Sequence, residues 1–78
     1  MPQKLVNLKD MDKAVLRDKR VTAELAAVEA DLGDAGRVLL RPSGTEPLIR
    51  VMVEATDEAR LDAAMDQLVT VLRDAAAE

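Results

Sequence analysis

Short apolar segments along the chain predict three strands. Leu5, Val6 and Leu8 predict a strand over Gln3–Lys9, with Pro2 at its edge, where a strand tolerates proline. Residues 37–41 form a second apolar run, bracketed by arginines. The clearest strand spans residues 48–55, because apolar residues at 49, 51, 53 and 55 alternate with a mixed set. This period of two predicts one face covered by helices and one facing solvent or a neighbouring domain.

Apolar residues three and four positions apart predict two amphipathic helices. The first begins near Arg20 and is ended by Gly33 and Gly36; its apolar stripe is Val21, Leu25, Val28 and Leu32. The second opens at Thr56-Asp57-Glu58, an N-cap followed by an acidic first turn. Its stripe is Leu61, Ala64, Met65, Leu68 and Leu72.

The order strand, helix, strand, strand, helix predicts an α+β two-layer sandwich, with a small, mainly antiparallel sheet and two helices on one face. Residues 10–20 are a charge-rich connector in which Met11, Val15 and Leu16 can pack as one helical turn. At 78 residues, the chain has room for one small domain, residues 1–78.

Composition narrows the classes of function. The chain has no cysteine and no histidine, which excludes disulfides and argues against a transition-metal site. It has no aromatic residue on which bases could stack, and its net charge of -4 should repel nucleic acid and anionic membranes. We expect neither as a partner. No apolar run resembles a membrane span or an export signal, so we expect a cytoplasmic location.

One stretch carries the opposite charge. Residues 37–50 contain three arginines and the single acid Glu46, a local formal charge of +2. Between the arginines, Ser43-Gly44-Thr45 offers two hydroxyl donors around a residue that lets backbone N–H groups approach an anion. Guanidinium forks, hydroxyls and loop amides together suit a phosphate ester. The same residues are also ordinary in a plain hairpin connection, so the residues alone leave both interpretations open.

The eighteen residues 37–54 resemble the C-terminal domain signature of the α-D-phosphohexomutase superfamily, most closely in its phosphoglucosamine mutase branch. Residues 2–7 resemble the first strand of the same domain. The resemblance implies a TATA-box-binding-protein-like fold and the last domain of a four-domain enzyme, with the other three domains as partners. Such enzymes interconvert glucosamine 6-phosphate and glucosamine 1-phosphate, for peptidoglycan precursors, through a phosphoserine and a bisphosphate intermediate.

The resemblance also assigns roles. By it, the substrate phosphate is held by Arg41, Ser43, Gly44, Thr45 and Arg50. Glu46 is expected to hold an arginine or to meet a sugar hydroxyl or amine. Arg37 is expected to be a solvated strand end, and the alternative role for Arg41 is an ion pair with Glu46 or Glu54.

The phosphoserine and Mg²⁺ of the parent enzyme have no counterpart in the sequence. We therefore expect no catalytic residue, no bound cofactor or metal, and no activity in this chain alone. Two alternatives remain: the phosphoglucomutase or phosphomannomutase branch, where Asn rather than Gly44 would follow the loop serine, and a free-standing anion-binding module. In either mutase, we expect some of Leu39, Leu48 and Met52 to be more exposed in this chain than in the intact enzyme.

Overall fold

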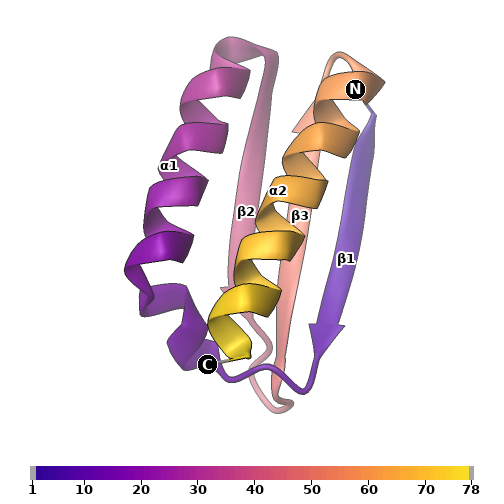
Figure 1. Cartoon of the computed structure of the whole chain (residues 1–78). Helices are drawn as coiled ribbons and strands as arrows, with labels where there is room; N and C mark the ends of the chain where they lie inside the picture. The colour runs from indigo at the N-terminus through magenta and orange to yellow at the C-terminus, as the bar shows by residue number, and fades with distance from the viewer. Residues whose placement is uncertain (1, 78) are drawn as a thin grey trace.

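The computed structural model describes residues 2–77 and shows one antiparallel sheet with two helices against it (Figure 1). The elements in chain order are β1 (Gln3–Lys9), the 3-10 helix η1 (Lys13–Arg17), α1 (Lys19–Leu32), the 3-10 turn η2 (Gly33–Ala35), β2 (Gly36–Pro42), β3 (Leu48–Ala55) and α2 (Glu58–Ala76). The strand order is β1-β3-β2, so that β3 is central. The predicted α+β two-layer architecture is confirmed.

Both helices begin at aspartate caps. The Asp18 side chain accepts a hydrogen bond from the backbone N–H of Arg20, and the Asp57 side chain accepts one from that of Ala59. Each cap satisfies a backbone donor that has no partner inside its helix. The α2 cap lies within the predicted Thr56-Asp57-Glu58 segment. The connector forms η1, the single turn expected there.

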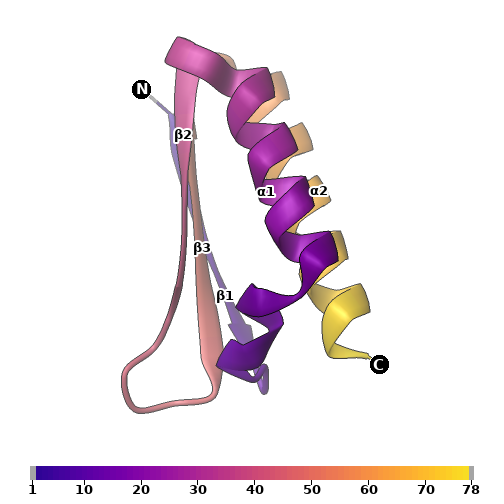
Figure 2. The ribbon, with the colours of Figure 1, turned by 90° about the vertical axis from the view of Figure 1, so that its left-hand side faces the viewer.

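The core lies between β3 and the helix pair, which cover the same face of the sheet (Figure 2). The four alternating residues of β3 are completely buried: Ile49, Val51, Val53 and Ala55. The whole predicted α2 stripe is also buried, with Leu68 and Leu72 fully enclosed. In α1, Val21, Val28 and Leu32 are buried, whereas Leu25 is only half-buried. Burial of each large aliphatic side chain stabilises the fold by about 1.5–3 kcal/mol.

The two glycines expected to end α1 have different roles. Gly33 ends the helix, with a φ of 52° that favours glycine. Gly36 instead begins β2 opposite Ala55, which corrects the prediction. A Cβ at Gly36 would lie 2.3 Å from the backbone oxygen of Glu54, so close strand pairing requires glycine there.

The second face of the sheet carries no helix, and we call it the open face. Strand register aligns its side chains in rows across β1, β3 and β2, because directly opposed residues point to the same side. The rows are Gln3–Glu54–Arg37, Leu5–Met52–Leu39 and Asn7–Arg50–Arg41. The last row lies nearest the loop that joins β2 to β3.

Candidate anion-binding site

The loop of residues 43–47 joins β2 to β3 and bends away from the helices (Figure 2). Its ends are closed by a hydrogen bond from the Ser43 N–H to the Leu48 oxygen, at 3.0 Å. The Leu48 N–H donates to the Glu46 oxygen at 2.8 Å, which tightens the return into β3. From the other side, the Met11 N–H donates to the Pro47 oxygen at 2.8 Å. The loop is therefore tied both to itself and to the chain that follows β1.

Two arginines face each other beside this loop. Arg41 of β2 and Arg50 of β3 are direct partners in the strand register and lie on the open face. Both are exposed. A hollow of about 290 Å³, which we call the loop hollow, is lined by Arg41, Pro42, Ser43, Gly44 and Arg50. The structure thus brings together four of the five residues predicted to bind phosphate.

These polar side chains have no partner within residues 2–77. In that range, no hydrogen bond or ion pair engages the side chain of Arg41, Arg50 or Ser43. Like charges directly opposite each other destabilise a sheet, and an anion between the two guanidinium groups would relieve their repulsion. The site therefore offers unused donors and a local excess of positive charge.

Arg37 differs from the other two arginines of this segment. Its Nε donates to the Glu54 Oε2 at 2.7 Å, although its side chain is largely exposed. Glu54 was an alternative partner for Arg41, but here it engages Arg37. The predicted solvated strand end thus carries an exposed ion pair, and such pairs contribute about 0–1 kcal/mol.

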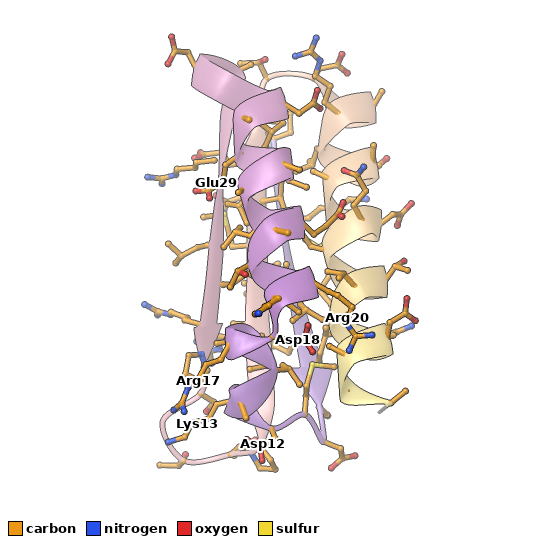
Figure 3. All side chains as sticks on the ribbon, turned by 60° about the vertical axis from the view of Figure 1, so that its left-hand side comes forward. Asp12, Lys13, Arg17, Asp18, Arg20 and Glu29 are labelled. Carbon is orange, nitrogen blue, oxygen red and sulfur yellow. The ribbon has the colours of Figure 1, made fainter. Side chains whose placement is uncertain are left out.

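Thr45 and Glu46 line another hollow, which shares Pro42, Ser43 and Gly44 with the loop hollow. This hollow of about 610 Å³ is lined by Asp10, Met11, Asp12, Lys13 and residues 42–48, and we call it the acidic hollow. Figure 3 shows Asp12 and Lys13 at this end of the molecule. Within residues 2–77, Glu46 forms no ion pair with Arg41 or Arg50, and neither arginine lines the acidic hollow. Three carboxylates against one ammonium make the acidic hollow unfavourable for a phosphate.

Gly44 is not required by the packing of the fold. A Cβ added there would meet no atom within 4 Å, and its φ is not in the left-handed region. This contrasts with Gly36, where the opposite strand excludes a side chain. Gly44 lines both the loop hollow and the acidic hollow, and the absence of a side chain there lets an incoming anion approach the backbone.

Asn7 and Leu5 were not among the predicted site residues, yet they lie on the open face. Asn7 is opposite Arg50, and Leu5 is opposite Met52. The alternation within Gln3–Lys9 was a usable signal, because Leu5 and Asn7 must face away from Val6 and Leu8. Leu39 is 47% exposed. Leu48 and Met52 are half-buried, so this face is not closed within the described chain.

Side-chain clusters suited to a metal ion are absent from the described part of the chain. Residues 2–77 contain no cluster of three or more acidic, cysteine or histidine residues able to hold an ion. The residues present therefore do not fit a Mg²⁺ site. No helix within the same range is both long and apolar enough to span a membrane.

Residues 5–71 match the family model described as the phosphoglucomutase/phosphomannomutase C-terminal domain. The match covers all of α1, most of α2 and all three strands except the first residues of β1. The chain belongs to this mutase family, as a C-terminal domain. The expected membership of the phosphohexomutases is confirmed.

Curated relatives of this mutase domain are bacterial phosphoglucosamine mutases. The protein from Thermobifida fusca is 59% identical over 75 residues, which are 95% of this chain and 17% of the relative. The protein from Corynebacterium jeikeium is 62% identical over 58 residues, 73% of this chain and 13% of its own length. The chain thus spans about a sixth or less of these relatives.

Solved structures support the same fold. An Aspergillus fumigatus N-acetylphosphoglucosamine mutase, in complex with glucose 1,6-bisphosphate, aligns with a TM-score of 0.79 at 22% identity, over 97% of this chain and 16% of that one. A structure of the enzyme from the same fungus with GlcNAc-6P and magnesium aligns with a TM-score of 0.76 at 23% identity, over 97% of this chain and 16% of that chain. At such identities, the likeness concerns the fold.

Proposed function

We propose that this chain is the substrate-phosphate-binding domain of a phosphoglucosamine mutase, and that it holds the phosphate in the loop hollow. The observation that carries the proposal is the pair Arg41 and Arg50, directly opposed on the open face and without a partner in the described chain. The mutase relatives supply the substrate class, a glucosamine phosphate.

The donor set suits a phosphate monoester. Two guanidinium groups can each donate paired N–H bonds to its oxygens, and the Ser43 hydroxyl and the amides around Gly44 add shorter-range donors. Thr45 lines the acidic hollow rather than the loop hollow, so we propose that only its backbone N–H, which follows Gly44 in the loop, donates to the phosphate. None of these groups distinguishes one sugar ring from another, so the same site can take either glucosamine 6-phosphate or glucosamine 1-phosphate.

The chain has a positioning role in this proposal. Holding the phosphate that is not transferred fixes the orientation of the sugar in the longer enzyme. Such orientation of the reactants lowers the activation barrier by several kcal/mol. The phosphoserine that exchanges the phosphoryl group lies in a part of the parent enzyme that this chain does not span. Residues 2–77 contain no side-chain cluster that fits the magnesium assisting the transfer. We propose that this chain alone is inactive. The parent is a cytoplasmic enzyme, and its other three domains complete the site.

A matched pair of arginine variants tests the proposal. Arg41→Ala removes one guanidinium from the loop hollow, whereas Arg37→Ala removes one from the same strand and face but outside the hollow. For glucosamine 6-phosphate and this chain, we expect a dissociation constant of about 1 mM or weaker, or about -4 kcal/mol. Arg41→Ala should weaken binding at least about tenfold, the usual loss for one charge-assisted contact.

Titrations followed by NMR measure the affinities of the wild type and both variants. Arg37→Ala should bind the sugar phosphate within about twofold of the wild type, because it disrupts only an exposed ion pair. Equal losses in both variants would indicate a nonspecific charge effect. Unchanged binding in Arg41→Ala would refute the proposed site.

A further inference from the structure

A third hollow adjoins the loop hollow on the open face. It measures about 270 Å³ and is lined by Leu5, Leu39, Arg41, Arg50 and Met52, and we call it the sheet hollow. Arg41 and Arg50 line both hollows. One side of the sheet hollow is therefore the same arginine pair that faces the loop, and the other side is the apolar row Leu5–Met52–Leu39.

The apolar row crosses all three strands midway along the sheet, and its two outer side chains are exposed. Leu5 is 59% and Leu39 is 47% exposed, and they are the large hydrophobic residues exposed within the described chain. They flank Met52 on neighbouring strands, so all three side chains form one continuous surface. An apolar group placed there would remove these side chains from water.

We propose that the sheet hollow is a second subsite, which binds the apolar body of a phosphate monoester whose phosphate is held by Arg41 and Arg50. The inference rests on the proposed function, since it needs the phosphate in the loop hollow. Its ligand class is a phosphate monoester with an aliphatic, aromatic or C–H-rich body. For a hexose phosphate, the matching part is the C–H-rich face of the ring.

The charge around the loop favours a ligand body that extends from the phosphate into the sheet hollow rather than into the acidic hollow. A ligand body extending to the other side of the loop would enter the acidic hollow, beside Asp10, Asp12 and Glu46. Those three carboxylates face the single cation Lys13, so a phosphate ester would be repelled on that side of the loop. The sheet hollow instead carries two cations at its border and three apolar side chains within, which complements a ligand with an anionic head and an apolar body.

Two ligands with the same head group measure the subsite directly. Methyl phosphate and benzyl phosphate carry the same phosphate monoester, but benzyl phosphate adds a ring that can cover the apolar row. Removing roughly 60 Å² of apolar surface from water raises the affinity about tenfold. Titration of the whole chain with each ligand, followed by NMR, should therefore give a ratio of about ten in favour of benzyl phosphate.

Variants separate the subsite from a general hydrophobic effect. Leu39→Ser removes an exposed apolar side chain of the sheet hollow, and Leu5→Ser removes the one on the other edge. Val71→Ser is the control, because Val71 is a half-buried residue on α2, in the helix layer. Both leucine variants should bring the affinity ratio toward one, while Val71→Ser should keep it near ten. Methyl phosphate should bind all folded variants with similar affinity.

Each outcome decides the inference. A ratio of about ten for the wild type that falls toward one in both Leu39→Ser and Leu5→Ser supports the subsite. Equal affinities of the two ligands for the wild type would overturn it and leave the proposed phosphate site intact; the apolar row would then serve another polypeptide surface. A preference that persists in both leucine variants would also overturn it. If neither ligand binds, the proposed function and the subsite both fail.

Discussion

At the scale of single residues, the three arginines of residues 37–50 are separated by their partners. Arg37 is neutralised by Glu54, whereas Arg41 and Arg50 face each other beside the loop. The positive charge available to a ligand is therefore concentrated at one end of the open face. The sequence alone does not show which of the three arginines is paired, because the strand register decides which acid lies beside each arginine.

Two glycines give a residue-scale prediction. Gly36→Ala should destabilise the chain by about 1–3 kcal/mol, because the new methyl group would overlap the Glu54 oxygen across the strand pair. Gly44→Ala should change the free energy of unfolding by less than about 0.5 kcal/mol, because its methyl group meets no atom. Thermal unfolding and phosphate titration measure both effects.

Gly44→Ala should affect phosphate affinity, although it should not affect stability. Gly44→Ala should weaken phosphate binding despite its unchanged stability, because the methyl group narrows the loop hollow. If Gly44→Ala bound phosphate as well as the wild type, close backbone approach at this position would not contribute to the site.

At the scale of elements, each helix start is fixed by an aspartate. At the start of α1, the Asp18 carboxylate accepts hydrogen bonds from the Arg20 backbone and side chain (Figure 3). The side-chain hydrogen bond from Arg20, followed by the backbone bond, lowers the pKa of Asp18 below its ordinary value of 3.8. Lys4 of β1 forms an ion pair with Asp62 of α2, which raises the Lys4 pKa.

The lowered pKa of Asp18 predicts a contribution to stability that is lost in acid. Because the pKa is lower in the folded than in the unfolded chain, the ionised carboxylate stabilises the fold above the unfolded pKa. This contribution is lost as the pH falls through the folded pKa. Asp18→Asn keeps an N-cap acceptor but removes the charge. Its melting temperature should be slightly lower than that of the wild type at about pH 7, and the difference should vanish near pH 2.

Melting curves at several pH values test this dependence. A difference that stays constant down to acid pH would show that the charge of Asp18 does not contribute, and that the side chain acts as a neutral cap alone.

Local sequence patterns predicted some features of the strands and helices but not others. The alternation in residues 48–55 fixed both the extent of β3 and its buried face, because a central strand under two helices has one fully apolar side. The role of Gly36 could not be predicted locally, since it depends on the backbone of Glu54 across the sheet. The alternation in residues 3–9 indicates which face Leu5 and Asn7 occupy, but their neighbours Met52 and Arg50 depend on the pairing of β1 with β3, which joins residues far apart in the chain.

At the scale of the whole molecule, the packing between the helix layer and the sheet stabilises the fold, and the open face of the sheet carries the proposed binding groups. The helices and the buried side of β3 form the core, and the open face carries the arginine pair and the apolar row. The architecture was predictable from the order of elements. The distribution of charge around the loop was not, because the arginines of the loop hollow come from β2 and β3, whereas Asp10 and Asp12 of the acidic hollow come from the connector after β1, which is far from both strands in the chain.

The most direct test of the central claim is to map where glucosamine 6-phosphate binds on the intact chain by NMR. The account predicts that shifts concentrate in the backbone amides of residues 43–45 and in the side-chain Nε–H groups of Arg41 and Arg50. Arg37 and the outer faces of α1 and α2 should be unaffected. Shifts centred on residues 10–13, or spread evenly over the surface, would contradict it.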